Sequence, residues 1–592
     1  MYICMHFVPY MKYVVSYSTH HQHFIDIEII IPVSGDKTTV QSAAWRPGRY
    51  ELGNFTKNVR KWSAFDESGK ALDFCKLNKD TWVVETKGIR ELHVKYSYYA
   101  ADLNAGSTFV DDKQLYMNPV NCCMYVPELM GQPLQLEILL PEHYIIATAM
   151  KKGQTKQEGK LYRHVLHAVN FEELGDSPLI ASATLKHNAF VMDGIEFHLW
   201  IQGECKPDWA KIINDFFIFI NDMVLMMKGS PIKEYHFLFH ILPYKYHHGV
   251  EHLASTVIVM GPSYNLMKDE LYNDFLGISC HELFHSWNIK TIRPVEMHPY
   301  DYTKENYSRL GYVYEGITTY YGDYLLFRSG VFSEFEYIKA IQREVQKHFD
   351  NYGRFNLSVA DSSFDTWLDG YVAGIPYRKV SIYTEGSIIA FITDMFIRKH
   401  TNNKNSLDDV MRLLYHEYAL KGKGYSEADF KKLVAEVAGT SYDDIFNNYI
   451  NKPADFEKPF REALGHIGMM LHTSPAKRNC ERYWGMKVQD DKVLQKVTAV
   501  APGSPAELAG ICPNDEIALI NGHQLKGNFH DWCTYYGDDD VRLSIISDQV
   551  RREVHIASIP GKEFFPSYHM TKTRSANLEQ QAAYRLWCNR EY

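Results

Sequence analysis

Short runs of alternating apolar and polar residues fill the first third of the chain. From residue 12 to about residue 185 these runs, such as 24–31 and 92–98, are separated by clusters of Gly, Asp, Asn and Pro. An alternation with period two places the apolar side chains on one face of a strand, and the clusters are typical of turns. The pattern predicts an antiparallel β-domain over residues 12–185.

The pattern changes from residue 186 onward. A mixed α/β segment comes first, with predicted strands at 197–201, 235–242 and 256–260 and a predicted helix at 209–227. From 315 to about 449 the apolar residues recur with the period of a helix, for instance over 335–349, 380–398 and 407–418. We therefore predict one domain over 186–462 that is α/β in its first half and mostly helical in its second.

Short strands and tight turns return over residues 463–565. An Asn-Gly pair at 521–522 lies between two apolar runs, which is a strong signal for a β-hairpin. A terminal helix is predicted at 576–587, within a tail over 566–592. Because 592 residues are too many for one hydrophobic core, we expect a multidomain α+β protein.

Residues 281–285 read His-Glu-Leu-Phe-His. Helix positions four apart project from the same face, so the imidazoles of His281 and His285 can bind one metal ion. Glu282 lies between them on the adjoining flank, where its carboxylate can take a proton from a metal-bound water without binding the ion. The spacing predicts a catalytic Zn²⁺ site, with Glu282 as general base. The alternative is a chance match on an amphipathic helix.

Catalytic zinc usually has three protein ligands and one position left for water. A histidine six residues after His285 would mark another class of zinc peptidase, but that residue is Thr291. Glu315 begins a predicted helical segment after a loop long enough to bring two helices side by side, so we expect it to be the third ligand. Four nearby residues are competing candidates: Glu296, His298, Asp301 and Asp323.

Composition narrows the classes of partner. The net charge of -9 and the pI near 6.3 give no electrostatic reason to expect nucleic acid or an anionic membrane. No apolar run is long enough to span a bilayer, and residues 1–10 lack the pattern of a signal peptide, although Met11 is an alternative start. The ten scattered cysteines favour free thiols in a reducing compartment. We therefore expect a cytoplasmic protein.

Several longer strings of residues resemble one known family. They are 44–50 (Ala-Trp-Arg-Pro-Gly-Arg-Tyr), 174–178 (Leu-Gly-Asp-Ser-Pro), 281–290 (His-Glu-Leu-Phe-His-Ser-Trp-Asn-Ile-Lys) and 314–321 (Tyr-Glu-Gly-Ile-Thr-Thr-Tyr-Tyr). Over nearly its whole length the chain resembles the glycyl aminopeptidase family of gluzincin zinc metallopeptidases, metallopeptidase family sixty-one. The resemblance implies an N-terminal β-domain, a thermolysin-like catalytic domain and a C-terminal PDZ domain.

Two further matches bear on mechanism. Residues 249–252 (Gly-Val-Glu-His) resemble a family segment, which implies that Gly249 and Glu251 bind substrate and that Glu251 holds its free α-ammonium group. Residues 382–386 (Ile-Tyr-Thr-Glu-Gly) resemble another, which implies that Tyr383 stabilises the developing oxyanion. Glu385 stands where a lysine is often found, and it would add negative charge near the transition state if it faced inward.

The C-terminal strands resemble a PDZ domain of the type attached to bacterial proteases. Residues 501–525 carry its hallmark, from Pro-Gly-Ser-Pro-Ala to the Asn-Gly pair. The resemblance implies a groove that takes a peptide as an added strand and binds its C-terminal carboxylate at a loop made of Tyr483, Trp484, Gly485 and Met486. Alternatively, Trp484 seals this groove against the catalytic domain.

These observations predict a zinc aminopeptidase. A water on the ion, activated by Glu282, would attack the first peptide bond of a peptide with a free N-terminus, and the family resemblance implies a preference for Gly or Ala at that end. One alternative is a PDZ-based binding protein with a non-catalytic zinc site. The other is an endopeptidase, or a hydrolase of another amide, that uses the same chemistry.

Overall fold

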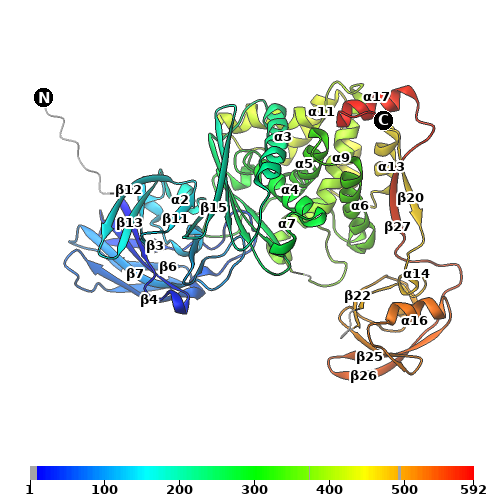
Figure 1. Cartoon of the computed structure of the whole chain (residues 1–592), viewed down its shortest axis with the longest axis horizontal. Coiled ribbons are helices and arrows are strands. Elements are labelled where there is room, and N and C mark those ends of the chain that lie inside the picture. The colour runs from blue at the N-terminus through cyan, green and yellow to red at the C-terminus, as the bar shows by residue number, and fades with distance from the viewer. Residues whose placement is uncertain (1–9, 373, 491–494) are drawn as a thin grey trace.

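The chain forms an elongated molecule with three parts, shown in Figure 1 by a computed structural model that describes residues 10–372, 374–490 and 495–592. A β-rich part lies at one end, a helical part with one sheet lies in the middle, and a small β-rich part lies beside the helices. Among the described residues, no helix is both long and apolar enough to cross a bilayer.

The N-terminal part contains three sheets. The largest has seven strands in the order β12 (Lys151–Glu158), β13 (Leu161–Ala168), β10 (Leu134–Pro141), β1 (Met11–Ser16), β2 (Phe24–Pro32), β7 (Glu91–Tyr99) and β4 (Val59–Asp66). The other two are β11 (Ile145–Thr148), β14 (Leu179–Ser182), β9 (Gln114–Met117) and β8 (Phe109–Val110), and β3 (Lys37–Gln41), β6 (Thr81–Glu85) and β5 (Phe74–Asn78). The predicted β-domain is therefore confirmed, with one departure: β1 and β10 pair in parallel rather than antiparallel.

The middle part begins with a five-stranded sheet. Its order is β15 (Lys186–Met192), β16 (Ile195–Gln202), β17 (Glu234–Ile241), β19 (Ser255–Gly261) and β18 (Tyr246–Glu251). β16, β17 and β19 run parallel, and the outer strands β15 and β18 run antiparallel to their neighbours. Helix α3 (Trp209–Met227) crosses from β16 to β17 with the bounds predicted from its periodicity.

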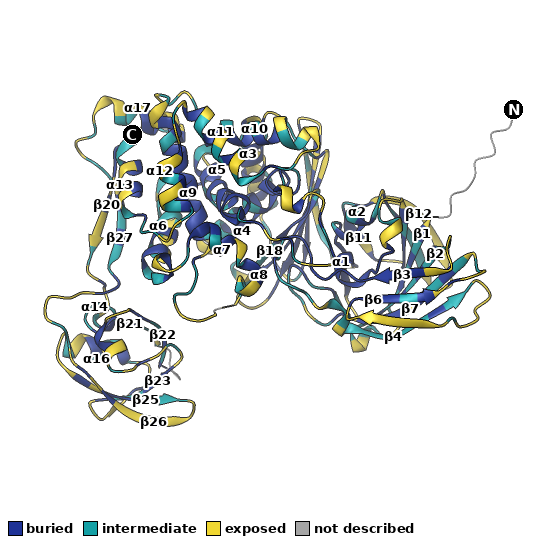
Figure 2. Cartoon of the chain, turned by 180° about the vertical axis from the view of Figure 1, so that it is seen from behind, coloured by how far each residue is buried: buried dark blue, intermediate teal, exposed yellow. Residues whose placement is uncertain are grey.

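Helices make up the rest of the middle part. The main ones are α4 (Asp269–Phe284), α5 (Thr318–Ser329), α6 (Glu334–Asp350), α9 (Ile382–His400), α10 (Leu407–Leu413), α11 (Glu427–Ala438) and α13 (Glu457–His466), with short helices α7 (Val359–Phe364), α8 (Thr366–Asp369) and α12 (Asp443–Ile445). Figure 2 shows α9 as a largely buried rod among the others. The run predicted over 407–418 changes from α-helix to π-helix at Leu414.

The C-terminal sheet consists of β21 (Met486–Asp490), β22 (Gln495–Val500), β23 (Glu516–Ile520), β25 (Val541–Ser547) and β26 (Val550–Ile556), with β24 (His523–Gln524) beside β23. Short helices α14 (Asn479–Arg482), α15 (Pro505–Leu508) and α16 (Phe529–Tyr536) accompany it. The hairpin predicted at Asn521-Gly522 joins β23 to β24, and both turn residues have positive φ (47° and 82°), as a type I′ turn requires.

Two strands connect this C-terminal sheet to the helices. β20 (Met469–Ser474) precedes the sheet and β27 (Ser567–Lys572) follows it, and the two pair with each other antiparallel. Their buried residues, and those of the terminal helix α17 (Leu578–Cys588), belong to the main hydrophobic core, whereas residues from Cys480 to Ile556 form a separate core. The C-terminal sheet is therefore inserted into the helical part, which differs from the expected division at residues 463 and 566.

Hydrogen bonds and an ion pair attach the N-terminal part to the middle part, and they are made by residues of the strings that resemble the family. The indole N–H of Trp45 donates to the Asp301 carbonyl oxygen at 2.7 Å. Asp176 pairs with the buried Lys290 at 2.7 Å, and His252 lies 3.1 Å from the same carboxylate. Lys290 follows the His-Glu-Leu-Phe-His sequence, so these contacts fix the N-terminal part close to the candidate metal site.

Candidate metal centre

Helix α4 carries the two histidines of the predicted site at its C-terminal end. His281 lies in the last turn, and His285 is the residue that caps the helix, still with helical φ and ψ. Their Nε2 atoms are 3.0 Å apart and their ring planes meet at 82°. The opposite side of α4 is held by buried apolar residues, among them Phe275, Leu276 and Leu283. Burial of that side directs both imidazoles the other way, toward one point.

Glu315 reaches the same point from the next helical segment. It lies in a π-helical stretch, Tyr312–Ile317, that leads into α5. Its Oε2 is 3.4 Å from His285 Nε2 and 3.9 Å from His281 Nε2. Extra residues in a π-helical turn often mark functional positions, because they push one side chain out of the regular helical path. Here the stretch points Glu315 at the two imidazoles.

These three side chains fit a zinc ion. Ligands at 2.0–2.1 Å from one ion in tetrahedral geometry lie about 3.4 Å from one another, which the three separations here bracket. His285 Nδ1 lies 2.6 Å from the Asn288 carbonyl oxygen, so this nitrogen carries the ring proton and Nε2 is left free to bind an ion. His285 and Glu315 are almost fully buried. A buried carboxylate beside two imidazoles needs a cation to balance its charge.

Glu282 lies beside the three candidate ligands without joining them. It is 5% exposed, and burial raises the pKa of its carboxyl group well above the usual range. Within the described parts of the chain, its Oε2 has no hydrogen-bond partner. Gly249 on β18 comes so close that a Cβ atom there would lie 2.1 Å from Glu282 Oε1. The glycine therefore makes the room that this carboxylate occupies.

Glu251 lies next to Glu282 and His285, on the side of the site away from the other candidate ligands. It ends β18, is 4% exposed, and forms with Glu282 and His285 a second set of mutually close ligand atoms. Burial raises the pKa of Glu251, and nearby Glu315 raises it further. Gly48 from the N-terminal part lies against it, since a Cβ atom on Gly48 would be 2.5 Å from Glu251 Oε2. The Oε1 atom of Glu251 has no hydrogen-bond partner among the residues that the structure describes.

Tyr383 enters the site from the first turn of α9. Its ring centre is 6.4 Å from that of His281, and its hydroxyl is hydrogen-bonded to Tyr371. α9 comes close because two glycines face each other: a Cβ atom on Gly316 would lie 2.3 Å from the Gly386 Cα atom. This backbone contact places the start of α9 beside the π-helical stretch that carries Glu315.

The predicted residues share one cavity of about 950 Å³. It is lined by His281, Glu282, His285, Glu315, Glu251, Gly249 and Tyr383 together with Gly48, and it extends along α6 past Asp323 and Arg343. The structure thus brings together every residue predicted for metal binding, catalysis and the substrate's amino terminus.

Comparison with protein families gives three matches along the chain. Residues 12–183 match the Peptidase M61 N-terminal domain, residues 274–389 match M61 glycyl aminopeptidase, and residues 496–545 match the PDZ domain. The second match contains both candidate histidines, Glu315 and Tyr383. This chain belongs to the M61 peptidase family.

The M61 peptidase also resembles solved structures. An aminopeptidase N family protein from Idiomarina loihiensis superposes with a TM-score of 0.89 at 23% identity, over 98% of this chain and 100% of the other, so the two share a fold. A mutant M1 zinc metallopeptidase from Deinococcus radiodurans bound to a Tyr-Ser-Ala substrate gives a TM-score of 0.48 at 10% identity, over 75% and 94% of the two chains.

One curated relative is a probable CtpA-like serine protease from Staphylococcus aureus (strain bovine RF122 / ET3-1), 26% identical over 151 residues. The match covers 24% of the M61 peptidase and 26% of the relative, so the chain spans about a quarter of that protein's length.

The competing ligands lie elsewhere in the M61 peptidase. Glu296 accepts a hydrogen bond from Ser308, His298 contacts the Gly422 carbonyl oxygen, and Asp301 caps a turn at Thr303. Asp323 faces the cavity, and burial raises its pKa to about 6. Within the described part of the chain, Glu315 is the acidic residue that shares a ligand cluster with both His281 and His285.

Glu385 faces away from the cavity. Its Oε2 accepts a hydrogen bond from His348 Nδ1 at 2.6 Å, while His348 Nε2 accepts one from the Phe456 N–H at 3.1 Å. Both side chains are at most 2% exposed. The Glu385 carboxylate therefore has a buried hydrogen-bond partner behind α9, and it does not line the cavity.

The predicted PDZ loop precedes the edge strand β21. Trp484 is fully buried in the C-terminal core, near Phe529, so it does not point toward the catalytic domain. Gly485 has a positive φ of 68°, and Met486 starts β21. Tyr483 is partly buried against the same core. An edge strand with free backbone groups is what a PDZ domain offers to an added peptide strand.

Gly48, which lines the cavity, and Tyr371, which contacts Tyr383 beside it, were not assigned from the sequence. The sequence assigned no role to Gly48, although its Ala-Trp-Arg-Pro-Gly-Arg-Tyr string was one of the family matches. Tyr371 binds both the Tyr383 hydroxyl and the Tyr50 N–H, at 3.2 Å for the latter. No pattern in the sequence marks Tyr371 among 41 tyrosines.

Proposed function

We propose that this M61 peptidase is a zinc-dependent aminopeptidase that removes small residues, such as Gly or Ala, from the N-terminus of peptides. The observation that carries the proposal is the convergence of His281, His285 and Glu315 on one point, with Glu282 next to it and Glu251 at the far side. Three protein ligands and an adjacent carboxylate that is not one of them are what a catalytic zinc site needs and a structural site lacks.

Zinc in this position supplies Lewis-acid chemistry and lowers the pKa of water that reaches it. Glu282 is placed to take the proton from the attacking water and to pass it to the leaving amine. Burial raises the pKa of its carboxyl group, which makes the carboxylate a stronger proton acceptor. Tyr383 supplies a hydroxyl that can donate to the oxygen on which negative charge develops.

Glu251 supports the choice of an aminopeptidase. Its buried carboxylate has an oxygen without a partner, and a substrate's α-ammonium group would satisfy it. A substrate bound in this way has its first peptide bond within reach of the metal site. The main chain at Gly48 lies against Glu251, which supports a preference for small first residues because a bulky side chain beside the ammonium group would meet this loop.

The test is hydrolysis of Gly-, Ala- and Leu-arylamides together with the zinc content of the purified protein. Wild type should release arylamine from the Gly and Ala substrates and contain zinc that a chelator removes with loss of activity. Glu282→Gln should keep its zinc and lose activity by about 100-fold or more. Glu251→Ala should raise KM most strongly for substrates with a free amino group.

Two outcomes would count against the proposal. Cleavage of internal bonds in N-acetylated peptides at the same rate as free peptides would contradict the role of Glu251. Normal activity in Glu282→Gln would remove its role as general base. Glu385→Gln is a suitable control near the site, because Glu385 faces His348 rather than the cavity.

A further inference from the structure

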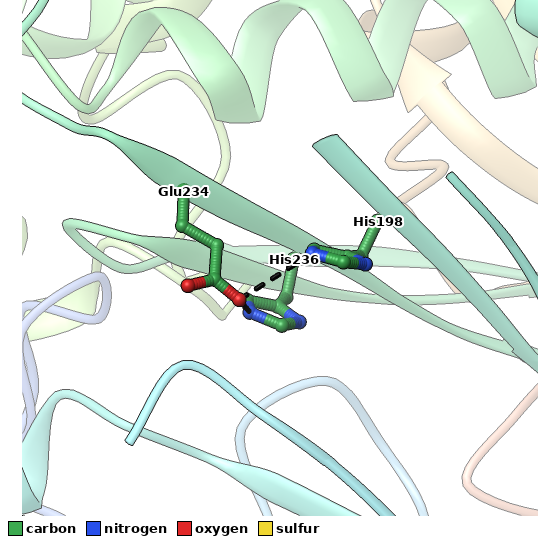
Figure 3. Close-up of side chains that lie close together, drawn as sticks. All are labelled: His198, Glu234 and His236. Carbon is green, nitrogen blue, oxygen red and sulfur yellow. Dashed lines mark hydrogen bonds and ion pairs between the residues drawn. The ribbon is translucent and has the colours of Figure 1, made fainter. Parts of the chain in front are cut away.

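A second group of metal-ligating side chains lies outside the catalytic cavity, on one face of the central sheet. His198 on β16 and His236 on β17 are register partners in neighbouring parallel strands. Glu234 is two residues before His236 and therefore projects from the same face. Figure 3 shows the Glu234 carboxylate turned toward both imidazoles. The peptidase mechanism uses none of these residues.

The ligand atoms are close and partly shielded. Glu234 Oε1 is 2.8 Å from His236 Nε2 and 3.4 Å from His198 Nε2, and all three ligand atoms lie within 4.8 Å of one another. The His236 side chain is 4% exposed and that of His198 is 17% exposed, whereas Glu234 is 55% exposed. His198 Nε2 is buried without a hydrogen-bond partner. An ion can thus enter from the Glu234 side.

We propose that His198, Glu234 and His236 bind a second divalent transition-metal ion, such as Zn²⁺. Two imidazoles and one carboxylate suit zinc, copper or nickel, and they do not suit Ca²⁺ or Mg²⁺, which prefer oxygen ligands. The donor set equals that of the catalytic candidate. Glu196, whose Oε2 is 3.6 Å from His198 Nε2, is available as a fourth ligand.

The surrounding charges favour a cation. The two carboxylates, Glu196 and Glu234, face histidines, and His236 Nδ1 accepts a hydrogen bond from the Trp200 indole N–H, so this ring carries a single proton and no charge. Lys152 is a positively charged neighbour of the cluster; its Nζ lies 5.8 Å from the Trp200 ring centre and donates to the Ile146 carbonyl oxygen. The carboxylates of Glu196 and Glu234 are charges that an ion at this site would balance.

The two imidazoles have different hydrogen-bond partners, and this difference affects how tightly the site would bind an ion. His198 Nδ1 lies 3.1 Å from His187 Nε2, which can accept its proton and leave His198 Nε2 free for the ion. At His236 the Trp200 indole N–H donates to Nδ1 at 3.1 Å, so the ring proton is on Nε2, where it faces Glu234. An ion must displace that proton to Nδ1 and break the Trp200 hydrogen bond.

Binding also requires a small rotation. The rings of His198 and His236 stack with centres 4.7 Å apart and planes 13° from parallel, whereas two ligands of one ion need lone pairs that converge. His198 is the more exposed of the two rings, so we expect it to be the one that turns. Together with the cost at Trp200, this makes the second site weaker than a preformed structural site and more strongly dependent on pH.

The experiment is calorimetric titration of the full-length, zinc-loaded protein with Zn²⁺ at pH 7.5. Wild type should bind one further ion. His198→Ala and His236→Ala should weaken this binding by about 10-fold or more, and Glu234→Gln should weaken it while keeping the side chain's shape. His472→Ala, which changes an exposed histidine on another strand, is the matched control and should bind as wild type does.

Trp200→Phe distinguishes a metal site from a histidine cluster with only a structural role. It removes the donor to His236 Nδ1 and should tighten the second site about fivefold. All variants should keep arylamide hydrolysis, which separates this site from the catalytic one. The proposal is overturned if wild type takes up no further ion, or if His198→Ala and His236→Ala bind it as tightly as wild type.

Discussion

The Tyr383 hydroxyl group has a hydrogen-bond partner in the protein and a proposed second role as donor to the substrate. In the described structure it is bonded to Tyr371, and its ring lies near His281. Tyr383→Phe should lower kcat of arylamide hydrolysis by about 100-fold and leave KM nearly unchanged, because the lost donor acts on the transition state. Steady-state kinetics on the Ala-arylamide measure both constants.

A second tyrosine serves as control for that substitution. Tyr442 is also buried and its hydroxyl is 2.6 Å from the Thr393 hydroxyl, but it lies outside the cavity. Tyr442→Phe should leave kcat unchanged. If both variants lost activity equally, the effect of Tyr383→Phe would be structural rather than catalytic.

Glu385 should matter for stability and not for chemistry. Glu385→Leu leaves the buried His348 Nδ1–H without an acceptor and should destabilise the protein by about 1–3 kcal/mol, seen as a lower thermal midpoint. The pH profile of kcat/KM should stay as in wild type, since the side chain does not face the cavity. Glu385→Gln retains an acceptor and should lose less; a shifted pH profile in either variant would place the charge near the substrate.

The sequence indicated the ligand pair because four-residue spacing on a helix is a local property. His281 and His285 needed no knowledge of the rest of the fold. Glu315 was harder, since competing acids occur nearby and the choice depended on which segment returned to α4. The destination of Glu385 could not be predicted, because His348 lies on another helix and only tertiary packing brings them together.

At the scale of elements, the crossing of α9 with the stretch before α5 depends on two glycines. Gly316→Ala would place a Cβ atom 2.3 Å from Gly386 Cα, so one segment must move. We expect a loss of about 1–3 kcal/mol in stability and, because Glu315 is adjacent, weaker zinc binding. Thermal unfolding and zinc retention against a chelator measure the two effects.

The control is a glycine in open space. Gly465 in α13 has no neighbouring atoms within 4 Å of the position that a Cβ atom would take, so Gly465→Ala should be neutral or stabilise by up to about 1 kcal/mol. Normal zinc retention in Gly316→Ala would show that Glu315 does not depend on this crossing.

Helices with one apolar face were predicted well, since their period is visible in the sequence. α3 has the predicted bounds, and α6 and α9 lie within two residues of theirs. The π-helical stretches were not foreseen, because one extra residue in a turn leaves no mark in the apolar period. The parallel pairing of β1 with β10 was missed for a similar reason: alternation reports which face is buried and not which strand is next.

At the scale of the whole molecule, the N-terminal part contributes to the candidate active site. Gly48 has a φ of 84° and lies against Glu251 across the boundary between the parts. Gly48→Ala should lower kcat/KM by about 10- to 100-fold through displacement of Glu251 or of the loop. Gly-arylamide hydrolysis measures this effect, and zinc content should be unchanged.

Gly69 provides the control for Gly48→Ala, because alanine there would strain the backbone without crowding any neighbour. It has nearly the same φ, 86°, but no atoms within 4 Å of a Cβ position. Gly69→Ala should cost about 1 kcal/mol of stability and no activity. If Gly48→Ala behaved in the same way, the loop would have no part in substrate binding.

The order of the three parts along the chain was predictable, but their contacts were not. Composition and turn signals separate the β-rich, mixed and C-terminal segments. The pair between Asp176 and Lys290 joins residues more than a hundred positions apart, and no local pattern reveals it. The same holds for Tyr377, whose hydroxyl donates to the Val500 carbonyl oxygen of the C-terminal sheet at 2.7 Å.

The pairing of β20 with β27 makes the C-terminal sheet a detachable loop of the catalytic domain. Ser474 and Ser567 face each other at the point where the chain departs and returns. Shortening the protein from its C-terminus would strip away Trp587 and its neighbours, which fill the peptidase core. Splicing Ser474 to Ser567 through a short turn would spare that core, so the peptidase could be studied without its peptide-binding module.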